Sequence, residues 1–306
     1  MPITDTTKEF LRSNEAETIF KQPERSQWQL AWIQVRRNRM ATLGMMIILL
    51  AIAVAVLSPV LAPANPTKQN MTSKLVAPSL GHPLGTDAFG RDVLSRMMYG
   101  SRTSLFVGLV TVLVAIAAGV PLGLVSGFIG GRFDNVVMRI MDAFLSFPAI
   151  MLALALMGIL GPDIQNVILA LGVVYMPTFA RLARASTLSV KEEKYITAAR
   201  NVGVSTPKIL FAHILPNIIA PLVVQATFNF SSAIVAAATL SFLGLGVQPP
   251  TPDWGFDLSE GRRYVRLAPW LTLAPTIAIS ITVLGINFFG DGLRDALDPR
   301  YRSESK

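Results

Sequence analysis

The sequence predicts an all-α polytopic membrane protein with six transmembrane helices. Of its 306 residues, 52% are hydrophobic and only 15% are charged, whereas a soluble domain has roughly 25% charged residues. The mean hydropathy is +0.50. Uncharged apolar runs recur along the chain, and several approach or exceed the ~20 residues that a helix needs to cross a bilayer. These observations favour a bundle of membrane-spanning helices over a soluble fold.

Net charge and reactive residues narrow the possible functions. The net charge is +8 and the isoelectric point is about 10.0. We attribute this excess to Lys and Arg at the edges of the spans and expect no nucleic-acid partner. The chain has no cysteine, which excludes disulfides, thiolate metal sites and cysteine nucleophiles. Its two histidines, His82 and His213, are expected on opposite sides of the membrane, so no metal site is predicted.

The N-terminal region is predicted to be a cytoplasmic tail followed by a first span. Residues 1–40 are polar and mixed in charge, unlike a signal peptide. Trp28 and Trp32 lie about one helical turn apart, which indicates an amphipathic helix at the membrane surface where the tail ends. Residues 41–61 carry no charge and form the first predicted transmembrane helix, which ends among prolines.

Residues 62–103 are predicted to be an extracytoplasmic linker and an interfacial helix. Apolar side chains recur every four residues within 85–100, which is typical of a helix lying along the membrane surface; they are Phe89, Val93 and Met97. Thr86 or Asp87 is expected to cap this helix. The glycines nearby do not form a phosphate-binding loop, because no strand precedes them and the chain has no Gly-Lys-Ser/Thr.

The second and third spans differ in their polar content. Residues 105–129 carry a series of small residues at four-residue spacing, which favours close approach of another helix; they are Ala115, Gly119, Gly123 and Gly127. The third span is expected at 136–160. Arg139 and Asp142 lie three residues apart near its cytoplasmic end, where a structural ion pair is a better explanation than a role in translocation.

The fourth span is expected at 164–180, the fifth at 217–243 and the sixth at 267–290. Between the last two lies an external loop rich in Gly and Pro, in which Trp254 is expected to anchor at the interface. Three polar residues share one face of the fifth span and form a candidate translocation path: Gln225, Asn229 and Ser232. Hydrogen bonding between helices is an equally good explanation for them.

The polar loop at 190–216 separates two long apolar segments. It contains residues that typically mark the start and the end of short helices. A short helix is expected over 192–202 and should end at Gly203 in a left-handed conformation. Thr206 and Pro207 predict the start of a second short helix. Because Ala198 and Ala199 are small, a partner can approach this turn closely. Docking onto another protein is therefore favoured over a loop that only connects two spans.

This loop resembles the Glu-Ala-Ala loop of ABC importer permeases, a cytoplasmic coupling helix that contacts the ATPase subunit in that family. The matching residues are Ala198, Ala199, Gly203, Leu215 and Pro216. Thr197 stands where the family often has Glu, and His213 where it often has an aliphatic residue. The resemblance thus implies an ATPase-coupling set within 190–216: Thr197, Ala198, Ala199, Arg200, Gly203, Pro207, Leu215 and Pro216.

Three further strings resemble the C-type subunit of the dipeptide, oligopeptide and nickel group of these permeases. They are GTDAFGRDVLSRMMYGSRTSL (85–105), SFLGLGVQPPTPDWG (241–255) and NFFGDGLRDALDPR (287–300). The resemblance implies the type I importer fold, with a five-helix permease core at 104–293 and a cytoplasmic tail at 294–306. It also implies a multi-pass protein of the bacterial inner membrane with both termini in the cytoplasm.

The same resemblance implies the partners and the solute class. They are a homologous B-type permease subunit in a heterodimer, two cytoplasmic ABC ATPase subunits that bind ATP and Mg, and an extracytoplasmic solute-binding protein. The solute is expected to be a di- or oligopeptide or a related compound. Because the chain has no nucleotide-binding loop, we expect it to be a transport subunit without enzymatic activity or a cofactor of its own.

Two other classes remain as alternatives. A secondary transporter or channel acting without an ATPase should show internal repeats and a buried, unpaired acidic residue, and the sequence shows no clear example of either. An intramembrane hydrolase needs paired aspartates, or Ser and His, deep within the spans, whereas both histidines fall in loops. For the importer, the expected mechanism is alternating access driven by the ATPase pair.

Overall fold

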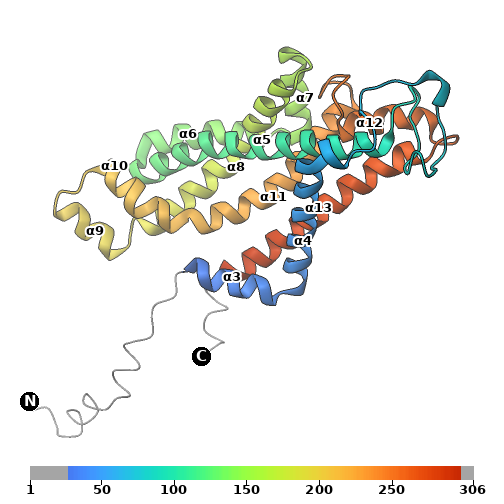
Figure 1. Cartoon of the computed structure of the whole chain (residues 1–306). Helices are drawn as coiled ribbons and strands as arrows, with labels where there is room; N and C mark the ends of the chain where they lie inside the picture. Colours follow the sequence, from blue (N-terminus) through green and yellow to red (C-terminus); the bar gives the residue numbers. More distant parts are fainter. Residues whose placement is uncertain (1–26, 298–306) are drawn as a thin grey trace, which may run out of the picture.

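The structure is a computed structural model and describes residues 27–297. The tails at 1–26 and 298–306 lie outside the described residues, so most of the predicted cytoplasmic N-terminal and C-terminal tails is not described. Within the described part the chain is helical, and its extended pairing is a single isolated bridge between Thr86 and Asp92. Figure 1 shows an elongated bundle with α9 and α10 at one end and α12 at the other. The helical architecture expected from the sequence is confirmed.

Five helical segments are long and apolar enough to cross a membrane. They are α4 (Arg39–Leu61), α5 (Val93–Ile129), α8 (Ile164–Val190), the segment Thr206–Phe242 that includes α11 (Leu215–Phe242), and α13 (Trp270–Leu297). Helices α6 (Gly131–Leu145) and α7 (Ala149–Leu160) meet at 91°, and they make a sixth span if the bent pair crosses the membrane as one. The remaining helices are short: α3 (Gln27–Arg37), α9 (Lys194–Asn201), α10 (Thr206–Lys208) and α12 (Trp254–Gly261).

The predicted interfacial helix at 85–100 is wrong. Helix α5 instead runs without a break from Val93 through the second span, and the carboxylate of Asp92, rather than Thr86 or Asp87, caps it by accepting from Ser95 N. Its polar face does not point to water, because Arg96 is only 2% exposed. The amphipathic pattern therefore reflects a buried polar contact at the α12 end of the bundle.

Helices α5 and α8 pack closely along the predicted series of small residues. A Cβ atom on Gly119 would lie 2.5 Å from the carbonyl oxygen of Met176, and one on Gly127 would lie 2.9 Å from that of Arg184. Such distances leave no room for a side chain. The glycines therefore allow the backbones of the two helices to touch, as their spacing predicts.

The third span contains a sharp bend that the sequence analysis did not anticipate. Helix α6 ends at Leu145, and α7 starts after Pro148, which lacks an amide hydrogen and ends the hydrogen-bond ladder. The predicted pair of Arg139 and Asp142 is also wrong. Asp142 pairs with Arg181 of α8 at 3.1 Å, and both side chains are about half-exposed. A partner from a neighbouring helix thus replaces the one that local spacing suggested.

The N-terminal helices attach to the last span. Helix α3 buries Ala31 and Val35 against Leu293 and Ala296 of α13. On its outer side, the guanidinium of Arg36 lies 4.8 Å from the ring centre of Trp32, which is 45% exposed. These contacts fit the expected amphipathic helix, although the side chain of Trp28 lies outside the described part.

Candidate functional site

The polar loop at 190–216 forms the tip of the bundle opposite α12 (Figure 1). Six residues of the predicted coupling set are exposed there: Thr197, Ala198, Arg200, Gly203, Pro207 and Pro216. The other two, Ala199 and Leu215, are partly buried. Most of the predicted set is therefore exposed in this part of the chain, and its coupling role stays a prediction.

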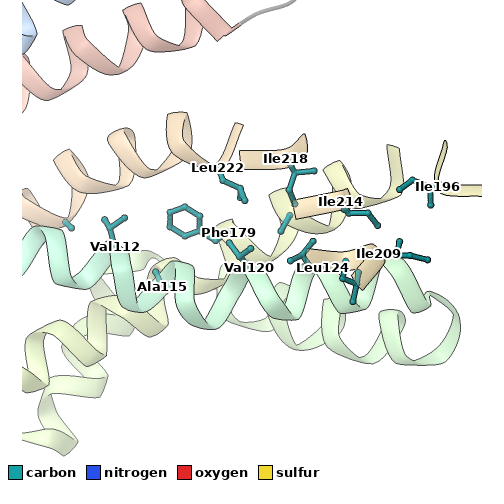
Figure 2. Close-up of a cluster of buried hydrophobic side chains, with 13 residues drawn as sticks. Val112, Ala115, Val120, Leu124, Phe179, Ile196, Ile209, Ile214, Ile218 and Leu222 are labelled. Carbon is teal, nitrogen blue, oxygen red and sulfur yellow. The ribbon is translucent and has the colours of Figure 1, made fainter. Parts of the chain in front are cut away.

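One apolar side chain anchors this tip to the bundle. Ile196 of α9 is fully buried in a cluster that also contains Ile209, Ile214 and Leu124. Figure 2 shows these side chains in a row that extends from α5 and α11 toward α9. Ile196 is the buried residue of α9, Ala199 is partly buried, and the other residues of this short helix are exposed. Displacement of α9 must therefore disturb the packing of the spans beneath it.

Gly203 ends the short helix as predicted. Its φ is +79°, in the left-handed region that favours glycine. The amide of Gly203 donates to the carbonyl of Arg200 at 3.0 Å, and the amide of Val204 donates to that of Ala199, also at 3.0 Å. A Cβ atom on Gly203 would meet nothing within 4 Å. The glycine thus provides the turn and leaves open space on the outer side.

The second short helix differs from the expectation. Ser205 rather than Thr206 is its N-cap, without a side-chain capping bond, and Pro207 lies in its first turn. The helix does not end before the fifth span. It passes through a π-helical segment, Ile209–Ile214, directly into α11. The tip is therefore rigidly joined to a span on its C-terminal side.

Three contacts join the tip to neighbouring helices. The ammonium of Lys191 donates to the carbonyl of Gly127 at 3.0 Å, and the guanidinium of Arg200 lies 4.5 Å from the ring centre of Phe128. Two turns before Lys191, within α8, Arg184 forms a two-bond ion pair with Asp134 of α6. Together they tie the base of the loop to the C-terminal end of α5 and the N-terminal end of α6.

The predicted stripe on α11 is only partly assembled. The amide of Gln225 donates to the side-chain oxygen of Asn229 at 3.0 Å, but Ser232 is exposed and forms no recorded bond with them. Asn229 is 6% exposed, and its own amide nitrogen has no partner among the described residues. The path remains a prediction. A related contact that the sequence analysis missed joins Ser231 to Asn287 of α13 at 2.8 Å.

A buried polar cluster lies at the α12 end of the bundle. The guanidinium of Arg96 donates to Asp257 of α12 at 2.8 and 2.5 Å, and to the carbonyl of Pro66 at 3.1 Å. Burial raises the pKa of Asp257 to about 6. Trp254 is 3% exposed and donates to the carbonyl of Met97 at 3.0 Å, so its predicted role as an interface anchor is wrong. Sequence analysis missed this cluster because Arg96 and Asp257 are 161 residues apart.

Burial also raises the pKa of Asp253, which caps α12 by accepting from the amide of Phe256 at 3.0 Å. Among the described residues, no group of three or more His, Asp or Glu side chains is arranged to hold a metal ion. The features that stand out are therefore an exposed loop at one end of the bundle, a polar pair on one span and a buried ion pair at the other end. This combination suits a transport subunit that exchanges motion with other proteins.

Comparison with known families identifies the chain. Residues 119–303 match the family model described as "Binding-protein-dependent transport system inner membrane component", which covers more than half of the chain. The chain belongs to this permease family. Residues 26–78 match a second model, described as "N-terminal TM domain of oligopeptide transport permease C". The protein is therefore a membrane-spanning permease component of a binding-protein-dependent transport system, and the resemblance to ABC importer permeases is confirmed.

Curated relatives cover nearly the whole chain. The dipeptide transport system permease protein DppC of Alkalihalophilus pseudofirmus is 45% identical over 91% of both chains. The di/tripeptide permease DppC of Pseudomonas aeruginosa is 41% identical over 95% of this chain and 97% of its own length. Among solved structures, an inward-facing form of the MetNI methionine ABC transporter superposes with a TM-score of 0.55 at 22% identity. It covers 66% of this chain and 96% of its own, which confirms the permease fold.

Proposed function

We propose that this permease carries peptides across the bacterial inner membrane, driven by ATPase subunits that dock on the α9 tip. The observation that carries the coupling role is the geometry of that tip. Small exposed residues of α9 lead to the left-handed turn at Gly203, while Ile196 fixes the helix to the spans. A docked protein can therefore approach closely on the outer face and push on packed side chains on the inner face.

The proposed assembly follows the family. The permease pairs with a homologous B-type subunit, two cytoplasmic ATPase subunits bind ATP and Mg²⁺, and an extracytoplasmic binding protein delivers the solute. Both termini then lie in the cytoplasm. In this proposal the tip, helix α3 with Arg36 and Arg37, and Arg39 at the start of α4 lie on that side, in accord with the positive-inside rule.

The proposed solute is a small peptide or a related compound. Support comes from the names of the relatives, which specify dipeptides, di- or tripeptides and, at 41% identity, glutathione. Gln225 and Asn229 are the candidate contacts along the path. Their amides can donate to and accept from peptide groups, and the spare amide hydrogens of Asn229 have no partner among the described residues.

The proposed motion passes through the contacts at the base of the loop. When the ATPase pair closes, α9 is displaced and moves α11 directly, because the two are joined through the helical segment that starts at Thr206. It also moves α5 and α6 through Lys191 and Arg184. ATP favours the outward-facing state only through its higher affinity for that state of the whole assembly.

A single-cysteine experiment tests the docking. The chain has no cysteine, so Ala198→Cys introduces its only thiol, at the exposed surface of α9. We expect a crosslink from this thiol to a co-expressed ATPase subunit whose yield changes on addition of ATP. Leu80→Cys, fully exposed at the extracytoplasmic end, is the matched control and should give none. An absent crosslink, together with purification of the chain as a lone homo-oligomer, would contradict the proposal and favour a secondary transporter.

A further inference from the structure

An apolar slot separates the first span from the rest of the bundle. It has a volume of about 230 Å³ and lies between α4, α5, α11 and α13. On α4 it is lined by Ile48, Ala51, Ile52 and Ala55, a spacing that defines one face of a helix. The wall is apolar throughout except for Thr282, whose hydroxyl donates to the carbonyl of Ala278 at 2.8 Å, and one arginine.

The slot lies beside the middle of α4, between a close contact near the inner end of the helix and a hydrogen bond just beyond its outer end. At its inner end, Gly44 lies so close to α13 that a Cβ atom would be 2.5 Å from the carbonyl oxygen of Gly285. At its outer end, the amide of Ala64 donates to the hydroxyl of Ser95 at 3.1 Å. Only 17% of the apolar part of α4 is buried in the chain. Most of the apolar surface of α4 is therefore not covered by the other helices of this chain.

The arginine lies at the outer end of the slot. Arg102 lines it together with Leu105, Phe106 and Leu109, again at the spacing of one helix face. Arg102 is seven residues beyond Ser95, so it lies about 10 Å below the outer anchor of α4 at 1.5 Å per residue. No hydrogen bond or ion pair to its guanidinium is found among the described residues. A cation at this depth reaches toward the lipid headgroups.

We propose that the slot holds one phospholipid of the outer leaflet, with an acyl chain between α4 and α5 and its phosphate on Arg102. The mouth of the slot suits this occupant, because Phe106, Leu109 and Ile52 are about half-exposed and lie at membrane depth. An apolar slot without unsatisfied groups stays dry, and hydrocarbon from the bilayer fills it. The guanidinium supplies the charge that a phosphate complements. The lipid seals the first span against the permease core.

Lipid retention tests the proposal. The chain is purified from membranes with any subunits that remain bound, washed in detergent, and given dioleoyl phosphatidylglycerol. Native mass spectrometry then counts the retained lipids. We expect Arg102→Ala to lower retention of one lipid by about tenfold, the ratio that 1.4 kcal/mol of binding free energy gives, and Arg102→Lys to restore part of it. Arg266→Ala, which removes an exposed extracytoplasmic arginine away from the slot, should change nothing.

A second variant separates the slot from the charge. Ala51→Phe fills the slot and keeps Arg102, and it should also release the lipid. Equal retention in the wild type, Arg102→Ala and Ala51→Phe would overturn the proposal. So would a crosslink from Ile52→Cys to another subunit, because a partner helix would then occupy the slot. Neither result depends on ATPase docking at α9, so the two proposals fail independently.

Discussion

Asp134 and Arg184 form a bidentate ion pair between α6 and α8, with nitrogen–oxygen distances of 2.6 and 2.5 Å. The hydroxyl of Ser126 on α5 donates to the same carboxylate at 2.5 Å. Three helices thus meet at one side chain, which is 8% exposed. This junction lies just before the chain leaves α8 for the coupling tip, and it fixes the position from which the tip departs.

We predict that Asp134→Asn destabilises the permease, because an amide cannot accept both bonds from Arg184 as a carboxylate does. The expected loss is about 1.5–3 kcal/mol, typical of hydrogen bonds to charged groups, and the thermal midpoint of the purified protein measures it. The control is Asp142→Asn, which breaks the half-exposed pair with Arg181 and should cost about 0–1 kcal/mol. Equal midpoints for the two variants would contradict this account.

Gly203→Leu should uncouple ATP hydrolysis from uptake. The substitution strains a backbone with φ of +79° and places a bulky side chain on the open face of the tip. Gly161→Leu is a matched control, because Gly161 has φ of +84° and equally open surroundings, but lies between α7 and α8. Uptake and ATPase rates of the reconstituted importer provide the readout. Wild-type coupling in Gly203→Leu, or equal uncoupling in both variants, would remove the docking role.

Ile196→Ala should loosen α9 without unfolding the bundle. Removing a fully buried Ile side chain costs about 2–5 kcal/mol, and here the loss falls on the contact that holds α9 to the spans. We expect faster amide exchange across 194–201 and a lower rate of ATP-driven uptake. Val202→Ala, at a side chain that is 79% exposed, should leave both unchanged. Unaltered exchange in Ile196→Ala would show that α9 is held by other contacts.

Gln225→Ala and Asn229→Ala should change the uptake kinetics and leave assembly intact, if these amides contact the solute. Copurification with partner subunits reports assembly, and initial rates over a range of dipeptide concentrations report transport. Ser232→Ala serves for comparison, because this hydroxyl is exposed and forms no recorded bond to the pair. Unchanged kinetics in the first two variants would exclude them from the path.

The stability of the α12 end of the bundle should respond to pH through Asp253. Burial raises the pKa of this carboxyl above 3.8, so the folded protein keeps a proton that the unfolded chain has released. Its contribution to the unfolding free energy therefore falls as pH rises above about 4. Asp253→Asn keeps a side-chain oxygen for the amide of Phe256 and cannot ionise. We expect its thermal midpoint to match the wild type at pH 4 and to exceed it at pH 7.5. A difference that shrinks with rising pH would reverse the assignment.

Much of this fold follows from local rules that operate over a few residues. The apolar runs predict the spans, and the left-handed turn at Gly203 follows from a glycine placed after a short helix. The close contact of α5 with α8 follows from the spacing of small residues. In each case a property of neighbouring residues decides the structure, so the sequence alone is sufficient.

The errors arise where a distant segment supplies the partner. Asp142 takes Arg181 rather than the nearby Arg139, and Arg96 finds Asp257 from 161 residues away. Because such partners depend on how the helices assemble, a buried polar face looks the same in sequence as an interfacial one. The bend after Leu145 was missed for a related reason: the apolar run continues through it, and only Pro148 marks the break.

The continuity of α5 has a mechanical consequence. With 37 residues, it is about 55 Å long at 1.5 Å per residue, well beyond the ~30 Å of hydrocarbon. Near one end, Arg96 pairs with Asp257 of α12. Near the other end, the carbonyl of Gly127 accepts a hydrogen bond from Lys191. The helix therefore acts as a single strut across the bilayer. A protein that binds on one side of the membrane and a protein that moves on the other side would therefore act on opposite ends of the same helix.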